Sequence, residues 1–311
     1  MNWIVNLILQ VGFALIIAPL TFGIISKIKA WSQHRIGAPF LQPYYNIAKL
    51  MKKDVLVSDT TSWIFRVAPY IYFISTLVAV AIIPIVPGLA INGFAGDAIF
   101  VVYLLAMGRF FLVMAGLDAG STFGGMGSSR EMMISSLIEP SIMAGLFTIG
   151  LTPAVQSLNI TEMFQNYNLF GASGFLLLGS FMIAVIVETA RIPVDDPSTH
   201  LELTMVHEAM VLEYSGRNLA LIELASAVKQ IVFSTLIVNI FLPFGCSVGG
   251  SLGFCIDLGF YFLKILGITI FIGIIEINAV KFRLFSVTNL AAISFILAFM
   301  GFVAAFVLEG V

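Results

Sequence analysis

Eight long runs of apolar residues constrain this chain more than any other feature. Each run is close to the about 20 residues that a helix needs to cross a bilayer. Inside lipid the backbone must satisfy its own hydrogen bonds, so each run is expected to be a helix. The predicted spans are Trp3–Ile25, Val67–Val86, Ala98–Leu117, Met132–Val155, Gly174–Ala190, Leu219–Leu242, Phe254–Ile277 and Thr288–Leu308. The sequence therefore predicts an all-α integral membrane protein with about eight transmembrane helices and short cytoplasmic amphipathic helices.

The composition excludes a soluble enzyme. Of the 311 residues, 59% are hydrophobic and 10% are charged, whereas soluble domains have roughly 45–50% and about 25%. So few charges cannot cover the surface of a soluble protein of this size. The net charge of −2 gives no basic field that would attract nucleic acid. Cys246 and Cys255 are too few for an iron–sulfur cluster or a CxxC metal site, although a disulfide between them is one alternative.

The basic residues predict the orientation of the chain. The loops after the first, third, fifth and seventh spans carry Lys and Arg, and the loops after the second, fourth and sixth carry none. By the positive-inside rule the odd loops are cytoplasmic and both termini lie outside. The first run lacks the charged start and cleavage pattern of a signal peptide, so it is a retained span. We expect one membrane domain over 1–311, with cytoplasmic loops at 26–66, 118–131, 191–218 and 278–287.

The first cytoplasmic loop predicts a docking surface. A Gly/Pro turn precedes Ile47, Leu50 and Met51, whose helical spacing indicates a short helix on the membrane surface. An anchor for anionic lipid is the alternative, but such an anchor does not need a shaped turn. The candidate docking residues are Gln33, Arg35, Gly37, Pro39, Gln42, Pro43, Lys49 and, in the second loop, Arg130.

The glycine-rich second loop is expected to be a turn. Gly124, Gly125 and Gly127 are interpreted as helix breakers between the third and fourth spans, with a serine capping the next helix. Glycines before a helix can bind phosphate, but this spacing matches no phosphate-binding motif and follows no strand.

The third cytoplasmic loop is rich in acids. Its Asp196-Pro197 pair resembles a helix N-terminus, which predicts a helix from about Pro197 to Tyr214. A zinc site is not expected, because Val211 stands where the HExxH pattern needs its second histidine. The acids either cap a polar helix or form a path for protons toward the membrane. They are Asp195, Asp196, Glu202, Glu208 and Glu213.

Seven ionisable residues interrupt the predicted spans. An unpaired charge at such depth costs about 2.5–3.5 kcal/mol or more, so these side chains must face one another or water. They are either structural ion pairs or, continued by the acidic loop, a route for protons or other ions. The set is Arg109, Glu139, Glu188, Glu223, Lys229, Lys264 and Glu276.

Several motifs resemble a known family. The stretch Glu188–Asp195, followed by Glu202-Leu203 and Glu213–Gly216, resembles the signature loop of the complex I H subunit, the mitochondrial subunit 1 family. A closer resemblance, to formate hydrogenlyase subunit 4 and component C of hydrogenase 4, is carried by Gly116–Phe123, Gly127–Glu131, Glu139-Pro140 and Lys229-Gln230. Ser198 and His200 stand where the family usually has acids, and the segment from Glu202 to Glu213 is about three residues longer.

The resemblance implies a non-catalytic subunit of an oxidoreductase complex in a prokaryotic inner or plasma membrane. Such a subunit docks a peripheral electron-transfer arm and links its redox chemistry to proton or sodium translocation by antiporter-like membrane subunits. It binds no metal itself. The partners, a hydrogenase-like large subunit and an iron–sulfur small subunit, carry 4Fe–4S clusters and, in hydrogenases, a nickel–iron centre. Two alternatives stay open: the quinone-binding H subunit of NADH:quinone oxidoreductase, and a stand-alone secondary transporter.

Overall fold

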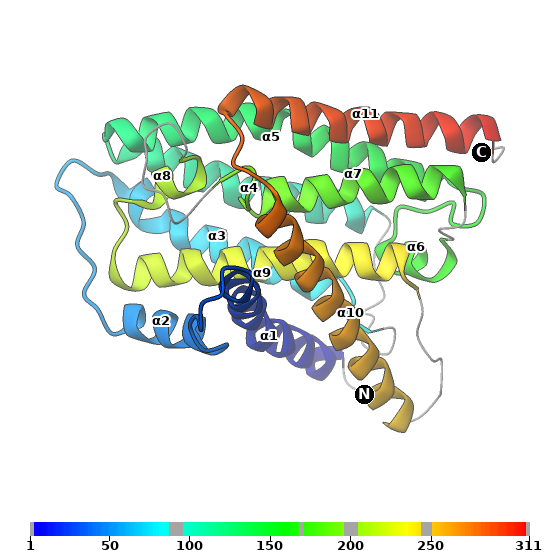
Figure 1. Cartoon of the computed structure of the whole chain (residues 1–311), viewed down its shortest axis with the longest axis horizontal. Helices are drawn as coiled ribbons and strands as arrows, with labels where there is room; N and C mark the ends of the chain where they lie inside the picture. Colours follow the sequence, from blue (N-terminus) through cyan, green and yellow to red (C-terminus); the bar gives the residue numbers. More distant parts are fainter. Residues whose placement is uncertain (1–2, 87–95, 168–170, 196–204, 244–250, 309–311) are drawn as a thin grey trace.

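In the computed structural model of this chain, residues 3–86, 96–167, 171–195, 205–243 and 251–308 are described. All the regular secondary structure in these ranges is helical (Figure 1). The helices are α1 (Trp3–Ser32), α2 (Gln42–Met51), α3 (Trp63–Ile82), α4 (Asp97–Asp118), α5 (Thr122–Leu151), α6 (Ile160–Asn166), α7 (Ala172–Glu188), α8 (His207–Val211), α9 (Gly216–Phe241), α10 (Ser251–Asn278) and α11 (Leu284–Leu308).

The long helices match the predicted spans. In the described part of the chain, seven helices are long and apolar enough to cross a membrane: α1, α3, α4, α5, α9, α10 and α11. The apolar helix α7 has 17 residues, which is at the lower end of the length that spans a bilayer. The prediction of an all-α membrane protein with about eight spans is confirmed. The surface helix expected after the Gly/Pro turn is also present as α2, and none of its residues is buried.

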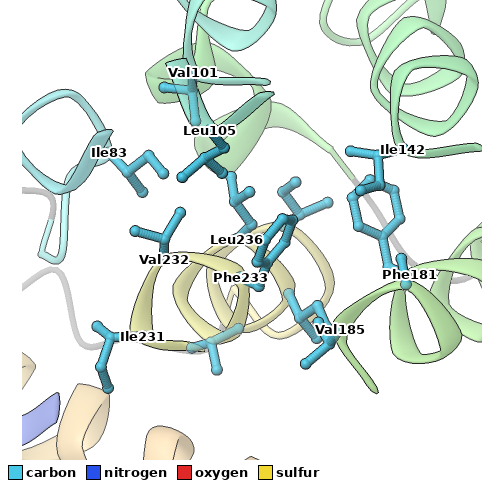
Figure 2. Close-up of a cluster of buried hydrophobic side chains, with 14 of the residues drawn as sticks. Ile83, Val101, Leu105, Ile142, Phe181, Val185, Ile231, Val232, Phe233 and Leu236 are labelled. Atoms are coloured by element: carbon cyan, nitrogen blue, oxygen red, sulfur yellow. The ribbon is translucent and has the colours of Figure 1, made fainter. Parts of the chain in front are cut away.

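Helix α9 forms the centre of the bundle. Most of its residues from Ala225 to Phe241 are buried, and it packs against α1, α3, α7 and α10. Figure 2 shows side chains of α9 between those of Ile83, just after α3, and α4 on one side and those of α5 and α7 on the other. The labelled residues are Ile83, Val101, Leu105, Ile142, Phe181, Val185, Ile231, Val232, Phe233 and Leu236. Polar groups on α9 are therefore positioned inside the protein, away from lipid.

Three serines join α5, α7 and α11 in the interior. The Ser141 hydroxyl lies 3.0 Å from that of Ser180 and 2.7 Å from that of Ser294. Ser294 also donates to the Ser180 carbonyl oxygen at 3.0 Å. Hydroxyls inside a membrane protein bond across helices because lipid offers no partner. This serine cluster fixes how the last helix lies against α5 and α7.

The glycines of the second loop do not break a helix. Helix α5 begins at Thr122, ahead of the expected Met132, and the Ser121 hydroxyl caps it by accepting from the Gly124 N–H at 3.1 Å. Gly127 lies inside α5, where a Cβ would stand 2.8 Å from the Val206 carbonyl oxygen. The interpretation of these glycines as breakers is wrong, because all three lie inside α5. Gly124 and Gly127 let neighbouring backbones approach closely.

The third loop contains less helix than expected. In its described residues only His207–Val211 are helical, so the predicted continuation to Tyr214 is wrong. Tyr214 instead turns toward α3, where its ring stacks on Phe65 at 4.1 Å and its hydroxyl donates to the Phe65 carbonyl oxygen at 2.9 Å. Asp196, Pro197 and Glu202 lie outside the described residues.

Candidate functional site

Five ionisable side chains from four helices meet inside the bundle. Arg109 of α4 is the centre of this group, which we call the Arg109 group. Its Nη1 lies 3.0 Å from Oε1 of Glu139, and its Nε lies 3.8 Å from Oε1 of Glu131, both on α5. Its Nη2 pairs with Oε2 of Glu188, the last residue of α7. The same Glu188 oxygen lies 2.7 Å from Nζ of Lys229 on α9.

The Arg109 group is largely shielded from solvent. The side chain of Glu188 is 1% exposed, those of Arg109 and Lys229 are 6% exposed, and that of Glu139 is 34% exposed. Charges at such depth persist only when partners compensate them. The structure thus brings together four residues of the predicted ion route, Arg109, Glu139, Glu188 and Lys229.

A second group lies at the C-terminal ends of α1 and α10. We call it the Glu276 group. The carboxylate of Glu276 lies 3.1 Å from Nζ of Lys29 and 3.3 Å from Nη1 of Arg191. Nη2 of Arg191 also donates to Oε1 of Gln230 at 2.7 Å, and the guanidinium lies 4.1 Å from the centre of the Phe22 ring. Burial lowers the pKa of Arg191 and Glu276 opposes that change, so the guanidinium keeps its charge at neutral pH.

A cavity of about 340 Å³ connects the two groups. Glu188 and Lys229 of the Arg109 group line it, and so does Arg191 of the Glu276 group. Two acids of the predicted ion route, Glu208 and Glu223, also line the cavity. Its apolar walls are Pro19, Phe22, Pro43, Ile47, Tyr72, Val211, Leu219 and Ile222. The cavity is therefore lined by both charged and apolar side chains.

Several buried polar atoms around this cavity lack a hydrogen-bond partner among the described residues. They are Oε1 of Glu188, Nε of Arg191 and Nε2 of Gln230. Buried polar atoms are nearly always paired, with protein or with ordered water. A polar cavity of this volume has room for water molecules, so these atoms are expected to bind water. Hydration would link the two groups.

The other acids of the predicted route differ in their surroundings. Asp195 stabilises local structure: its Oδ1 lies 3.3 Å from Nζ of Lys281, and its Oδ2 accepts from the His207 N–H at 2.8 Å and so caps α8. Glu213 is exposed. Across the described ranges, no three His, Cys, Asp or Glu side chains lie close enough to hold a metal ion.

Lys264 lies apart from the Arg109 group. Its Nζ donates to the carbonyl oxygen of Leu242 at 2.7 Å, just beyond the end of α9. Leu242 is about 20 Å along α9 from Lys229, at 1.5 Å per residue. The structure therefore does not bring Lys264 together with the Arg109 group.

The predicted docking residues lie on an exposed turn between α1 and α2. Gln33, Arg35 and Pro39 are exposed, as is Lys49 on α2, while Gln42 and Pro43 are half-buried. Gly37 has a φ of +67°, which favours glycine. Arg130 faces elsewhere, because its Nη1 donates to the Met205 carbonyl oxygen at 2.9 Å, next to the start of α8.

Sequence reasoning missed four members of the two groups: Glu131, Lys29, Arg191 and Gln230 were not among the predicted ion-route residues. Glu131 precedes Glu139 by about two helical turns, which would have placed both on one face of a longer helix. The expected start of that span at Met132 concealed this relation. Lys29 and Arg191 were counted only as basic residues that set the orientation. Gln230 was named only in the Lys229-Gln230 motif of the family resemblance, which assigned it no place in the ion route.

Comparison with known proteins identifies relatives over nearly the whole chain. A protein-family model described as NADH dehydrogenase matches residues 4–307. Hydrogenase-4 component C of Escherichia coli is 32% identical over 94% of this chain and 93% of its own length. Formate hydrogenlyase subunit 4 of the same organism is 29% identical over 93% of this chain and 94% of its own length. NADH-ubiquinone oxidoreductase chain 1 of Triticum aestivum is 28% identical over 73% of each chain.

The fold also has a solved counterpart. A chain of the membrane-bound sulfane sulfur reductase, an archaeal respiratory membrane complex, superimposes with a TM-score of 0.84. The superposition covers 98% of this chain and 100% of that one at 18% sequence identity. At that identity the match shows the fold alone.

Proposed function

This chain belongs to the NADH dehydrogenase family, as a membrane subunit of the complex I-like and hydrogenase-like type, and we propose that it couples redox chemistry to ion movement. In this proposal its inner face docks a peripheral electron-transfer arm, and its buried charges pass the effect of the redox reaction to neighbouring membrane subunits. The observation that carries the proposal is the sharing of one Glu188 oxygen between Arg109 and Lys229.

Sharing one carboxylate makes the Arg109 group sensitive to the movement of a single proton. In a low-dielectric interior, a change of charge on one group strongly alters the proton affinity of its neighbours. A proton that reaches Glu188 from the cavity would weaken both ion pairs at once. Arg109 would then turn to Glu131 and Glu139, its remaining partners. A charge change at the cavity is thereby transmitted to α5.

Glu139 is the natural exit of this path. Its side chain is 34% exposed, whereas that of Glu188 is 1% exposed. A carboxylate that faces lipid alone is costly, so a partially exposed one inside a span suits contact with another membrane subunit. We propose an antiporter-like subunit as that neighbour and proton or sodium as the ion.

The partner on the inner side is a soluble arm with a hydrogenase-like large subunit and an iron–sulfur small subunit. The exposed turn between α1 and α2, with Arg35 and Lys49, supports docking. In this proposal the 4Fe–4S clusters, and a nickel–iron centre in a hydrogenase, belong to the arm. The complex lies in a prokaryotic inner or plasma membrane, with both termini of this chain outside.

Two measurements test this function. Purification of the tagged chain from its native membrane in mild detergent, followed by mass spectrometry, should identify arm and antiporter-like subunits in the same complex. Reconstituted vesicles should acidify, or take up sodium, when a donor is supplied to the arm. A chain that purifies without any redox subunit would contradict the proposal and support a stand-alone transporter.

The cavity favours a second candidate function, quinone binding. Its volume of about 340 Å³ lies within the range of small-molecule sites, which are mostly apolar with a few polar groups. The apolar walls suit the apolar tail of a long molecule, and the Arg191 and Lys229 cations suit its carbonyl headgroup. A photoreactive quinone that labels residues lining the cavity, such as Leu219 and Ile222, would support this function. Labelling only at the lipid-facing surface would contradict it.

A further inference from the structure

The turn between α1 and α2 folds back along α1 and is fixed there by close contacts. Nζ of Lys27 donates to the Ile36 carbonyl oxygen at 2.7 Å and lies 5.8 Å from the centre of the Phe40 ring. Gly23 of α1 faces the same segment, and a Cβ at this position would collide with the carbonyl oxygen of Phe40. The inner half of α1 and the docking turn therefore move together.

Tyr44, in the first turn of α2, reaches into the backbone of α1. Its hydroxyl donates to the carbonyl oxygen of Ile16, and the Leu20 amide is close enough to affect the pKa of the phenol. In an α-helix this carbonyl is the acceptor for the Leu20 N–H, so Tyr44 adds a second donor to a backbone acceptor of α1. Burial raises the pKa of Tyr44, which the Leu20 amide opposes, so the phenol stays protonated and keeps its donor.

Pro19 makes this point of α1 easy to bend. It lies inside the helix, and proline has no N–H, so one bond of the backbone ladder is missing next to the Ile16 carbonyl that Tyr44 contacts. Sharp bends in helices occur at prolines and where a side chain inserts into the ladder. Here a proline is present, and the side chain that contacts the neighbouring carbonyl comes from the helix that follows the docking turn.

The part of α1 beyond this point forms a wall of the cavity. Phe22 and Ser26 of α1 line it together with Asn46 and Ile47 of α2, across from Glu188 and Lys229 on the other helices. The same part of α1 also contacts the Glu276 group. Lys29 pairs with Glu276, and the Phe22 ring lies against the Arg191 guanidinium. A small bend at Pro19 would thus change both the width of the cavity and the surroundings of Arg191.

We propose that Tyr44 is a positioning residue that ties the docking turn to this wall, so that attachment of the peripheral arm sets how far water enters the cavity. The proposal rests on the proposed function, since the arm is the partner that occupies the turn. Because α2 is a short helix that follows the turn directly, a displacement of the turn moves α2, and the Tyr44 hydroxyl passes this movement to α1. Access of water to Glu188 and Lys229 then depends on the attached arm.

Thiol labelling tests the proposal without relying on ion pumping. In a chain with Cys246→Ser and Cys255→Ser, Ser226→Cys places one thiol in the cavity wall. Its rate of reaction with a small water-soluble maleimide should change several-fold when a chaotropic wash removes the arm from the complex. Tyr44→Phe keeps the ring and removes the hydroxyl, and should abolish that change. Tyr70→Phe, the same replacement at an exposed site on α3, should leave it intact.

A second variant separates positioning from stability. Gly23→Ala pushes the Phe40 carbonyl away from α1 and should also abolish the response while a native gel shows an assembled complex. If both variants assemble and the labelling rate still responds to the arm, Tyr44 has no positioning role, although the proposed function stands. If the unaltered chain purifies without an arm, the proposed function itself is wrong.

Discussion

Glu188 and Lys229 are ion-paired between α7 and α9, with Oε2 and Nζ 2.7 Å apart, in a position where both side chains are almost fully buried. The same oxygen also serves Arg109. Glu188 is thus the one carboxylate that two cations need, whereas Arg109 has Glu131 and Glu139 as further partners. This asymmetry predicts that replacing different members of the Arg109 group lowers the stability of the chain by different amounts.

Glu188→Gln should destabilise the chain more than Lys229→Met. The first change leaves a buried cation without its carboxylate, which costs about 3–5 kcal/mol. The second leaves Glu188 still paired with Arg109. The double variant should be more stable than Glu188→Gln alone, because no unpaired cation remains on α9. Thermal unfolding in detergent measures the stability of the two single variants and the double variant. If the two losses of stability simply add in the double variant, Glu188 and Lys229 are not coupled.

Glu139→Gln should separate assembly from ion movement. The change keeps the shape of the side chain and leaves Arg109 with Glu188 and Glu131, so the complex should form normally on a native gel. Ion translocation in vesicles should fall by roughly a hundredfold, the lower end of what a proton-transferring group contributes. Glu162→Gln on α6, an exposed acid outside both groups, is the control. Unchanged pumping in an assembled Glu139→Gln complex would make the group a set of structural ion pairs.

Arg35→Ala should weaken attachment of the arm. Arg35 is exposed on the docking turn, and loss of one good interface contact lowers affinity about tenfold, or about 1.4 kcal/mol. The fraction of arm subunits that remains on washed membranes measures the effect. Lys52→Ala, at an exposed position just after α2, removes a positive charge from the same loop. Equal retention of the arm in both variants would mean that Arg35 only sets the orientation of the chain.

Single thiols should report the predicted orientation. In the chain without native cysteines, Ser58→Cys lies in the loop between α2 and α3, and Gln165→Cys lies on α6. A membrane-impermeant maleimide should label Gln165→Cys in whole spheroplasts and Ser58→Cys only in inverted vesicles, because the basic loops face the cytoplasm. Labelling of both thiols from one side would overturn the orientation.

The number and type of elements could be predicted from the sequence, but the partners of the buried charges could not. Long apolar runs specify helices because lipid leaves the backbone no other partner. The seven intramembrane charges looked equivalent, yet Lys264 bonds a backbone carbonyl and Glu276 joins a group that includes Lys29. Which charge meets which depends on the rotation and tilt of each helix, and these are set by packing between distant segments.

The glycines of the second loop illustrate the same limit. A glycine-rich stretch in a sequence is compatible with a turn and with close packing of helices. Gly127 proved to be a packing site because Val206 and Ala209 approach α5 there, and those residues lie about 80 positions later in the chain. Local sequence carries no trace of such a contact.

The serine cluster has a consequence for how the protein is made. Helix α11 is synthesised after α5 and α7, because it follows both in the chain. Until it arrives, the hydroxyls of Ser141 and Ser180 have only each other at this site, and Ser294 then supplies the missing partner. A chain that stops before α11 would therefore lack the two hydroxyl contacts that Ser294 makes in the cluster. The packing of α5 against α7 at this point is therefore completed only when α11 arrives.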